Sequence, residues 1–253
     1  MPRVRPVATT GIWIIGIAAY VGGLIYTLPA TFIDARLESM TGNAIRLSEA
    51  QGTLWSGSGQ LEIREQDRRI GDAHELSWHL SPGALLLGRL KFELKFGQSG
   101  QPFPLTVTWS RIELTNASIH FPAAALGLAV PKLSALALRG ALSLRVDHLT
   151  LSQSEVKGDA VLEWNRAGSA LTPVSPLGDY RLDIKSLHHS GTVSMRTLKG
   201  PLQIDGKGQW SADAALLFLG NARVPPQLQQ QLTPLLRLIA VDRGSGNFDI
   251  RIQ

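Results

Sequence analysis

The sequence predicts a mainly β protein in which a single N-terminal transmembrane helix precedes an antiparallel, twisted β-sheet or β-sandwich with one or two short helices. Two observations predict this class. An uncharged apolar run extends from Ile12 to Leu28 near the N-terminus. Beyond residue 44, apolar and polar residues alternate with a period of two in many short stretches, the pattern of strands with one buried and one wet face.

The apolar run has the properties of a membrane anchor, which we place at residues 11–29. As a helix, Ile12 to Leu28 would span roughly 25 Å, which is at the short end for a bilayer hydrocarbon core. Trp13 and Tyr26 lie near its two ends, where amphipathic rings favour the headgroup region. The alternative is a cleaved signal peptide, but Leu28 is bulky where a cleavage site needs a small residue.

Basic residues set the expected orientation of this anchor. Arg3 and Arg5 precede the apolar run, and the next basic residue is Arg36. Because positive charge is retained in the cytoplasm, residues 1–10 are expected there and the residues after the anchor outside it. The sequence therefore predicts a single-pass membrane protein whose C-terminal domain lies outside the cytoplasm.

Residues 30–43 are predicted to form a juxtamembrane amphipathic helix. Phe32, Ile33 and Leu37 recur at helical spacing, and Gly42 follows as a stop signal. Such a helix could lie on the membrane surface or cap the following domain, and nothing local decides between the two.

Residues 44–253 are predicted to form one β-rich domain. Leu149 and Leu151 fall on the opposite parity from Leu142 and Leu144, which predicts a β-bulge near Asp147. A late helix is expected over residues 227–240, kinked or broken at Pro234. The clearest alternating stretches are residues 59–64, 91–96, 142–146, 180–185, 202–210 and 248–252.

No motif in the sequence indicates catalysis or the binding of a metal or cofactor. The chain has no cysteine and its six histidines lack metal-ligand spacing; G-x-S-x-G and phosphate-binding loops are also missing. We therefore expect no enzyme activity, catalytic residue, cofactor or metal. The formal net charge of +5 is spread among mixed charges, which argues against a nucleic-acid partner.

The most distinctive local motif surrounds one tryptophan with small residues. It comprises Gly52, Thr53, Leu54, Trp55 and Gly57. Glycines allow a large ring to lie against neighbouring backbone, so the motif predicts a tight turn or bulge that places Trp55 in the core. The alternative is a partner-contacting corner, because tryptophan is favoured at interface hot spots.

This motif, together with other blocks in the same order, resembles the N component of the type II secretion machinery (general secretion pathway protein N). The resemblance covers nearly the whole chain beyond residue 28. Further blocks that carry it are Leu76-Ser77-Trp78 with Leu80 and Pro82, Leu86-Leu87-Gly88-Arg89-Leu90, Leu138 to Leu142, Gly158 to Ala167, Leu177 to Tyr180, Gly200-Pro201-Leu202 and Val224-Pro225.

The resemblance implies an accessory component of the bacterial inner membrane, single-pass and with a periplasmic C-terminal domain, that supports assembly of the apparatus or transport of folded proteins across the outer membrane. It also implies the outer-membrane secretin and the inner-membrane platform as partners, and it transfers no catalytic residue. The alternative is a lipid-handling β-module like the AsmA-type envelope proteins. An open groove lined by Leu142, Leu144, Leu202 and Ile204 would favour that alternative, and a closed core would count against it.

Overall fold

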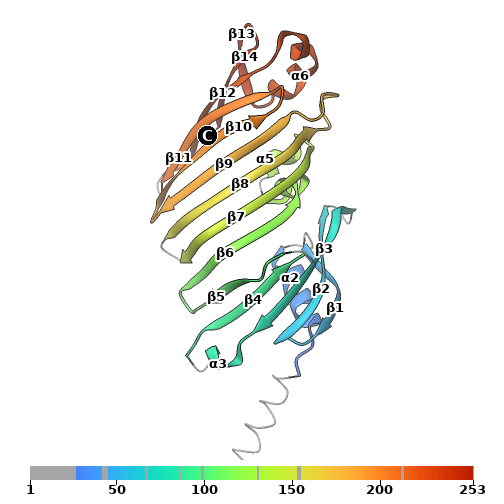
Figure 1. Ribbon diagram of the computed structural model, residues 1–253, viewed down its shortest axis with the longest axis vertical. Coiled ribbons are helices and arrows are strands. Elements are labelled where there is room, and N and C mark those ends of the chain that lie inside the picture. The colour runs from blue at the N-terminus through green and yellow to red at the C-terminus, as the bar shows by residue number, and fades with distance from the viewer. Residues whose placement is uncertain are drawn as a thin grey trace, which may run out of the picture.

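A single antiparallel sheet of 14 strands forms the body of the molecule in the computed structural model. The structure describes residues 27–41, 45–65, 68–85, 87–97, 100–129, 131–152, 155–211 and 214–252. The strands follow one another along the long axis of the molecule, and the sheet twists and curves as it rises (Figure 1). The predicted mainly β class is thus confirmed, and its form is one sheet rather than a two-sheet sandwich.

The strands are arranged in chain order, with one exception. β14 is inserted between β12 and β13, so that β13 forms the last edge of the sheet. The strands are β1 (Ile45–Gly52), β2 (Ser56–Glu65), β3 (Arg68–Leu80), β4 (Leu90–Phe96), β5 (Phe103–Val107), β6 (Arg111–Pro122), β7 (Leu138–Ser152), β8 (Val156–Ser169), β9 (Gly178–Leu187), β10 (Ser190–Lys199), β11 (Gln203–Ser211), β12 (Ala214–Arg223), β13 (Ala240–Gly244) and β14 (Asn247–Ile252).

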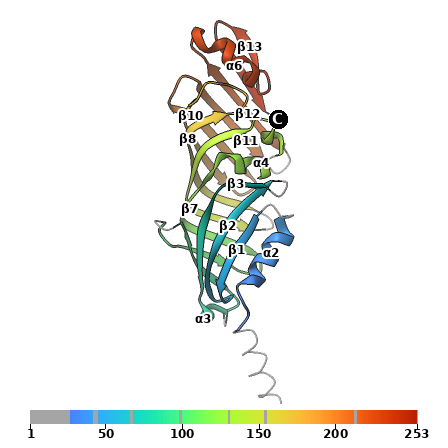
Figure 2. The same ribbon diagram turned by 90° about the vertical axis from the view of Figure 1, so that its right-hand side faces the viewer.

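The described helices are short and lie in the connections or at the ends of the sheet. α2 lies beside β1 at one end, and α6 lies near β14 at the other (Figures 1 and 2). They are α2 (Thr31–Thr41), α3 (Pro82–Leu85), η1 (Ala123–Ala125), α4 (Leu126–Ala129), α5 (Pro131–Ser134), η2 (Pro226–Leu228) and α6 (Gln229–Leu236).

Strand register gives the sheet one apolar face. Leu162 of β8 lies opposite Leu182 of β9, which lies opposite Met195 of β10. The next residues along these strands point to the other face and are mostly polar, as in the pair of Asp183 and Ser194. Because each strand keeps this alternation, burial of the apolar face fixes the register across the sheet.

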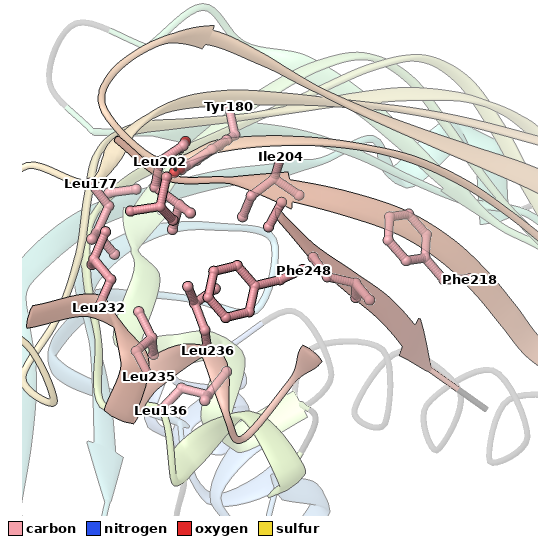
Figure 3. Packing of buried hydrophobic residues seen from close by; sticks show 14 of the residues in the cluster. Leu136, Leu177, Tyr180, Leu202, Ile204, Phe218, Leu232, Leu235, Leu236 and Phe248 are labelled. Carbon is pink, nitrogen blue, oxygen red and sulfur yellow. Dashed lines mark hydrogen bonds between the residues drawn. The ribbon is translucent and has the colours of Figure 1, made fainter. Parts of the chain in front are cut away.

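The largest apolar cluster lies at the C-terminal end of that face. Leu232 and Leu236 of α6 are buried against Leu202, Ile204 and other residues of the sheet (Figure 3). Pro234 lies inside α6 without splitting it, and the helix ends at Leu236 instead of continuing to residue 240. The sequence predicted a kink or a break at Pro234; the helix is shorter than expected and is not broken at this residue.

The predicted transmembrane span lies almost wholly outside the described residues. The same holds for Arg3, Arg5, Trp13 and Tyr26, which carry its predicted topology. Within the part of the chain that the structure describes, no helix combines the length and the apolar character needed to cross a bilayer.

Tyr180 gives the C-terminal cluster a testable pH dependence. Burial raises the pKa of its phenol well above the ordinary value of 10.0, and the neighbouring charge of Asp179 raises it further. Unfolding therefore releases a proton once the pH exceeds about 10, so stability should be complete below that pH and fall by about 1.4 kcal/mol per pH unit above it.

Tyr180→Phe should remove this alkaline loss while costing about 1 kcal/mol at neutral pH, because the phenol donates a 2.8 Å hydrogen bond to the Leu202 carbonyl. Urea midpoints of both proteins at about pH 8 and about pH 11 check this. Equal alkaline losses in the two proteins would contradict it.

Candidate functional site

The chain enters the sheet at a hydrogen-bonded corner, which we call the entry corner (residues 28–30, residues 52–57 and Trp78). Pro29 forms an isolated antiparallel bridge with Thr53. On either side of this bridge, the Leu54 N–H donates to the Leu28 carbonyl over 2.9 Å and the Ala30 N–H donates to the Gly52 carbonyl over 3.1 Å. The first described residues are therefore fixed to the sheet.

Gly52 allows the turn between β1 and β2 to close. Its φ of +90° is unfavourable for residues with a side chain, and a Cβ there would lie 2.4 Å from the Ser56 carbonyl oxygen. Thr53 completes the turn, because its hydroxyl accepts hydrogen bonds from the N–H groups of Trp55 and Ser56, each over 3.3 Å. The glycine and the hydroxyl at these two positions therefore have local structural roles.

Trp78 of β3 closes the corner from the neighbouring strand. It is paired with Gly57, and a Cβ on Gly57 would lie 2.5 Å from Cζ2 of the indole. The indole N–H donates a 3.1 Å hydrogen bond to the Thr53 carbonyl, and the side chain is only 4% exposed. Trp78 thus holds the turn through both its ring and its polar atom. The expectation that the turn places Trp55 in the core was wrong: Trp55 and Leu54 are half-buried, and Trp78 of the neighbouring strand is the buried ring of this corner.

α2 covers the edge of the sheet next to this corner. Its residues Ile33 and Leu37 pack against the buried cluster of Ala30, Leu47 and Trp78. The Asp34 carboxylate accepts a 2.7 Å hydrogen bond from the Leu47 N–H of β1. An edge strand otherwise offers unpaired backbone donors to other chains, so this contact protects the first edge of the sheet. Of the two expected positions for this helix, α2 occupies the one that caps the domain.

Removing the Asp34 carboxylate should weaken this end of the molecule. Asp34→Ala leaves the Leu47 N–H without its charged acceptor, which should cost about 1.5–3 kcal/mol of unfolding free energy. Asp34→Asn retains an acceptor oxygen and should lose less. Urea unfolding of the three proteins, followed by circular dichroism, measures the difference. A full loss in the asparagine variant would assign the effect to charge, including the 3.9 Å contact with Arg46, instead of to the hydrogen bond.

The structure brings all five motif residues into the entry corner. Trp78 in this corner and the contact of Asp34 beside it were not predicted from the sequence. The tryptophan lies 25 residues from Thr53, and only the register of β2 with β3 unites them. An acidic residue in the first turn of a predicted helix is an ordinary helix signal, so it does not reveal a contact with a strand.

The described residues do not assemble a group of ligands that could hold a metal ion. Individual histidines have separate neighbours: His120 lies 3.2 Å from the Ser143 hydroxyl, and His188 lies 3.7 Å from Glu155. Among the described residues, the candidate site is therefore the entry corner, where residues 28–30 are hydrogen-bonded to the turn between β1 and β2.

The structure therefore defines a mainly β protein that is built on one extended antiparallel sheet. The chain belongs to the family of type II secretion system (T2SS) protein N, whose family model matches residues 43–251. The resemblance of the sequence blocks is thereby confirmed. The family is one of secretion components and is not a known family of enzymes.

Two relatives carry the same name. The type II secretion system protein N of Aeromonas hydrophila is 27% identical over 246 residues, which is 94% of this chain and 94% of the relative. The protein of that name from Vibrio cholerae serotype O1 is 26% identical over 208 residues, covering 75% of this chain and 78% of the relative. No solved structure matches the chain. The chain is accordingly a type II secretion component of the cell envelope.

Proposed function

We propose that the protein is an accessory structural component that supports assembly of the secretion apparatus or passage of folded proteins through it. Residues 11–29 anchor it in the inner membrane, residues 1–10 lie in the cytoplasm, and the sheet stands in the periplasm. Its partners are the outer-membrane secretin and the inner-membrane platform. Family membership supports the role in secretion, and the periodicity and charge of the sequence support the topology.

The entry corner is the observation that favours a fixed structural element over a mobile carrier. Leu28, Pro29 and Ala30 are each bonded into the first turn of the sheet. The predicted anchor therefore ends where the sheet begins, without a linker. Such a connection would hold the sheet at a set height and orientation above the bilayer.

Secretion by cells that lack the encoding gene tests the proposed role. We expect export of a folded enzyme to fall, and expression of the intact chain to restore it. A version with residues 1–27 replaced by an unrelated single-pass anchor, which leaves Leu28 and Pro29 of the entry corner in place, should also restore export, whereas a cleavable signal peptide should restore less. Unchanged export in the deletion strain would contradict a role in secretion, and equal rescue by the signal peptide would contradict the role of the anchor.

The two half-buried side chains of the entry corner are also a proposed partner contact. Leu54 and Trp55 lie at the turn between β1 and β2, where a partner could reach the parts that remain exposed. A photo-crosslinking residue in place of Leu54 should capture the secretin or the platform in intact cells. Capture of neither, with normal export, would leave the motif with its structural role alone.

A further inference from the structure

We propose that two adjacent turns form a second contact with the membrane, to a bilayer surface that carries anionic phospholipid headgroups. We call them the paired turns: residues 87–89, after α3, and residues 108–111, between β5 and β6. This inference rests on the proposed inner-membrane anchor, because it concerns how the anchored sheet stands on the bilayer.

The paired turns expose large apolar side chains. Trp109 is 100% exposed and Leu87 is 75% exposed. Tryptophan is highly buried on average in folded proteins, so a fully exposed indole at a loop tip is unusual. Its amphipathic ring favours the headgroup region of a bilayer.

Both turns are held by hydrogen bonds that keep these side chains outward. The Thr108 N–H donates to the Arg111 carbonyl over 2.8 Å, and the Thr108 hydroxyl accepts from the Arg111 N–H over 3.2 Å. In the other turn, the N–H groups of Leu87 and Arg89 each donate 3.1 Å bonds to the Ala84 carbonyl. Little conformational entropy is therefore lost when the tips meet a surface.

The two turns lie side by side. β4 and β5 are paired up to Leu90 and Val107, and the turns begin immediately beyond that pair. A hollow of about 380 Å³ between them is lined by Leu87, Arg89, Trp109 and Arg111, among others. The apolar tips and the basic residues thus belong to one surface.

The charge of this surface fits anionic headgroups. Arg89 and Arg111 are both exposed. Arg111 lies 3.4 Å from Glu113, but both side chains of that pair face solvent, where ion pairs contribute little. Two protruding tips suit shallow insertion among headgroups better than the broad, complementary patch of about 800 Å² per partner that a stable protein interface requires.

The position of the paired turns agrees with this assignment. α3 follows directly from β3, whose Leu80 N–H donates a 2.6 Å bond to the Trp55 carbonyl at the entry corner. Both views place α3 at the same end of the molecule as the start of the described chain (Figures 1 and 2). A bilayer that holds the predicted anchor would therefore lie on the side of the sheet where the turns protrude.

Single labelled cysteines in the full chain test the proposal, and the natural chain contains no cysteine that would interfere. Leu87→Cys and Trp109→Cys carry a fluorophore that responds to polarity, in vesicles of phosphatidylethanolamine and phosphatidylglycerol. Leu238→Cys is the matched control, because this leucine is 59% exposed close to α6 at the other end of the sheet. We expect blue-shifted emission and strong quenching by nitroxide lipids at positions 87 and 109, and water-like, unquenched emission at 238.

The arginines separate headgroup binding from simple apolar contact. Replacing Arg89 and Arg111 with glutamine should lower the equilibrium constant for insertion of the labelled turns into the bilayer about fivefold per charge. Replacement of the anionic lipid by phosphatidylcholine should weaken it similarly. Shielding that is equal in both lipids would contradict recognition of anionic headgroups.

Two further results would overturn the proposal. Labels at 87 and 109 that stay in water would exclude the second contact. Labels that become shielded only in membranes containing the assembled secretion apparatus would assign the turns to a protein partner. Resistance of the full chain to alkaline extraction from membranes tests the predicted anchor independently. The anchor proposal and the proposal for the paired turns can therefore be contradicted separately.

Discussion

Replacing Trp78 with alanine is expected to lower the free energy of unfolding by about 3–5 kcal/mol. The side chain is 4% exposed between α2 and the first strands, so its removal leaves a large cavity in the N-terminal cluster. The Thr53 carbonyl also loses the hydrogen bond from the indole N–H. Loss of both contacts should loosen the whole entry corner.

Urea unfolding of the full chain in detergent, followed by circular dichroism, measures this effect. Trp109→Ala is the matched control: the residue type is the same but fully exposed, so its stability should change by less than about 0.5 kcal/mol. Trp78→Phe should lose less than the alanine variant, because the ring is partly retained. Equal midpoints for Trp78→Ala and Trp109→Ala would show that the corner contributes nothing to stability.

The same substitution links the entry corner to the proposed function. If the corner fixes the sheet relative to the anchor, Trp78→Ala should reduce export of folded enzymes even when the protein level is restored by stronger expression. Normal export at an equal protein level would mean that the orientation of the sheet is unimportant for export. It would contradict the proposal that the entry corner acts by fixing the sheet relative to the anchor.

Alternation along the chain predicted six of the 14 described strands, namely β2, β4, β7, β9, β11 and β14. Each of these stretches lies in a strand, because antiparallel pairing can hide the apolar side chains that share one parity, as it hides Ile204 and Phe248. The parity change around Asp147 predicted a bulge, and the register of β7 with β8 indeed shifts between Val146 and His148. Alternation and its change of parity depend only on neighbouring residues in the chain, so both can be recognised in a single sequence.

Contacts between residues that are far apart in the chain could not be predicted from the sequence. Alternation does not distinguish one long sheet from two packed sheets, since either hides an apolar face. The pairing of Trp78 with Gly57 depends on the register of a neighbouring strand. The exposure of Trp109 was unpredictable for the same reason, because an isolated turn does not reveal whether another element will cover it.

The apolar face also bears on the alternative of a lipid groove. Of the four side chains proposed to line such a groove, Leu142, Leu202 and Ile204 are buried. Leu202 and Ile204 belong to the cluster in which α6 packs against the sheet (Figure 3). Protein side chains thus occupy the space that an acyl chain would need at this end, which favours a structural role over lipid handling.

Leu232→Ala tests whether α6 is part of the core or a removable cover. Leu232 is 0% exposed within the C-terminal cluster, so truncation should cost about 2–5 kcal/mol of unfolding free energy. Leu238→Ala provides the matched control, because this leucine lies just beyond α6 and is 59% exposed. Its stability should stay within about 0.5 kcal/mol of the natural protein.

A removable cover would respond differently. If α6 closed a lipid groove, weakening its contact would open the groove, and phospholipid would co-purify with Leu232→Ala in greater amount while the unfolding midpoint changed little. If α6 is instead part of the hydrophobic core, the truncation leaves a small closed cavity that is too small for an acyl chain. The free energy of unfolding then falls, and the amount of bound lipid does not rise. Native mass spectrometry and urea titration of the same preparation therefore distinguish the two, and we expect the second result.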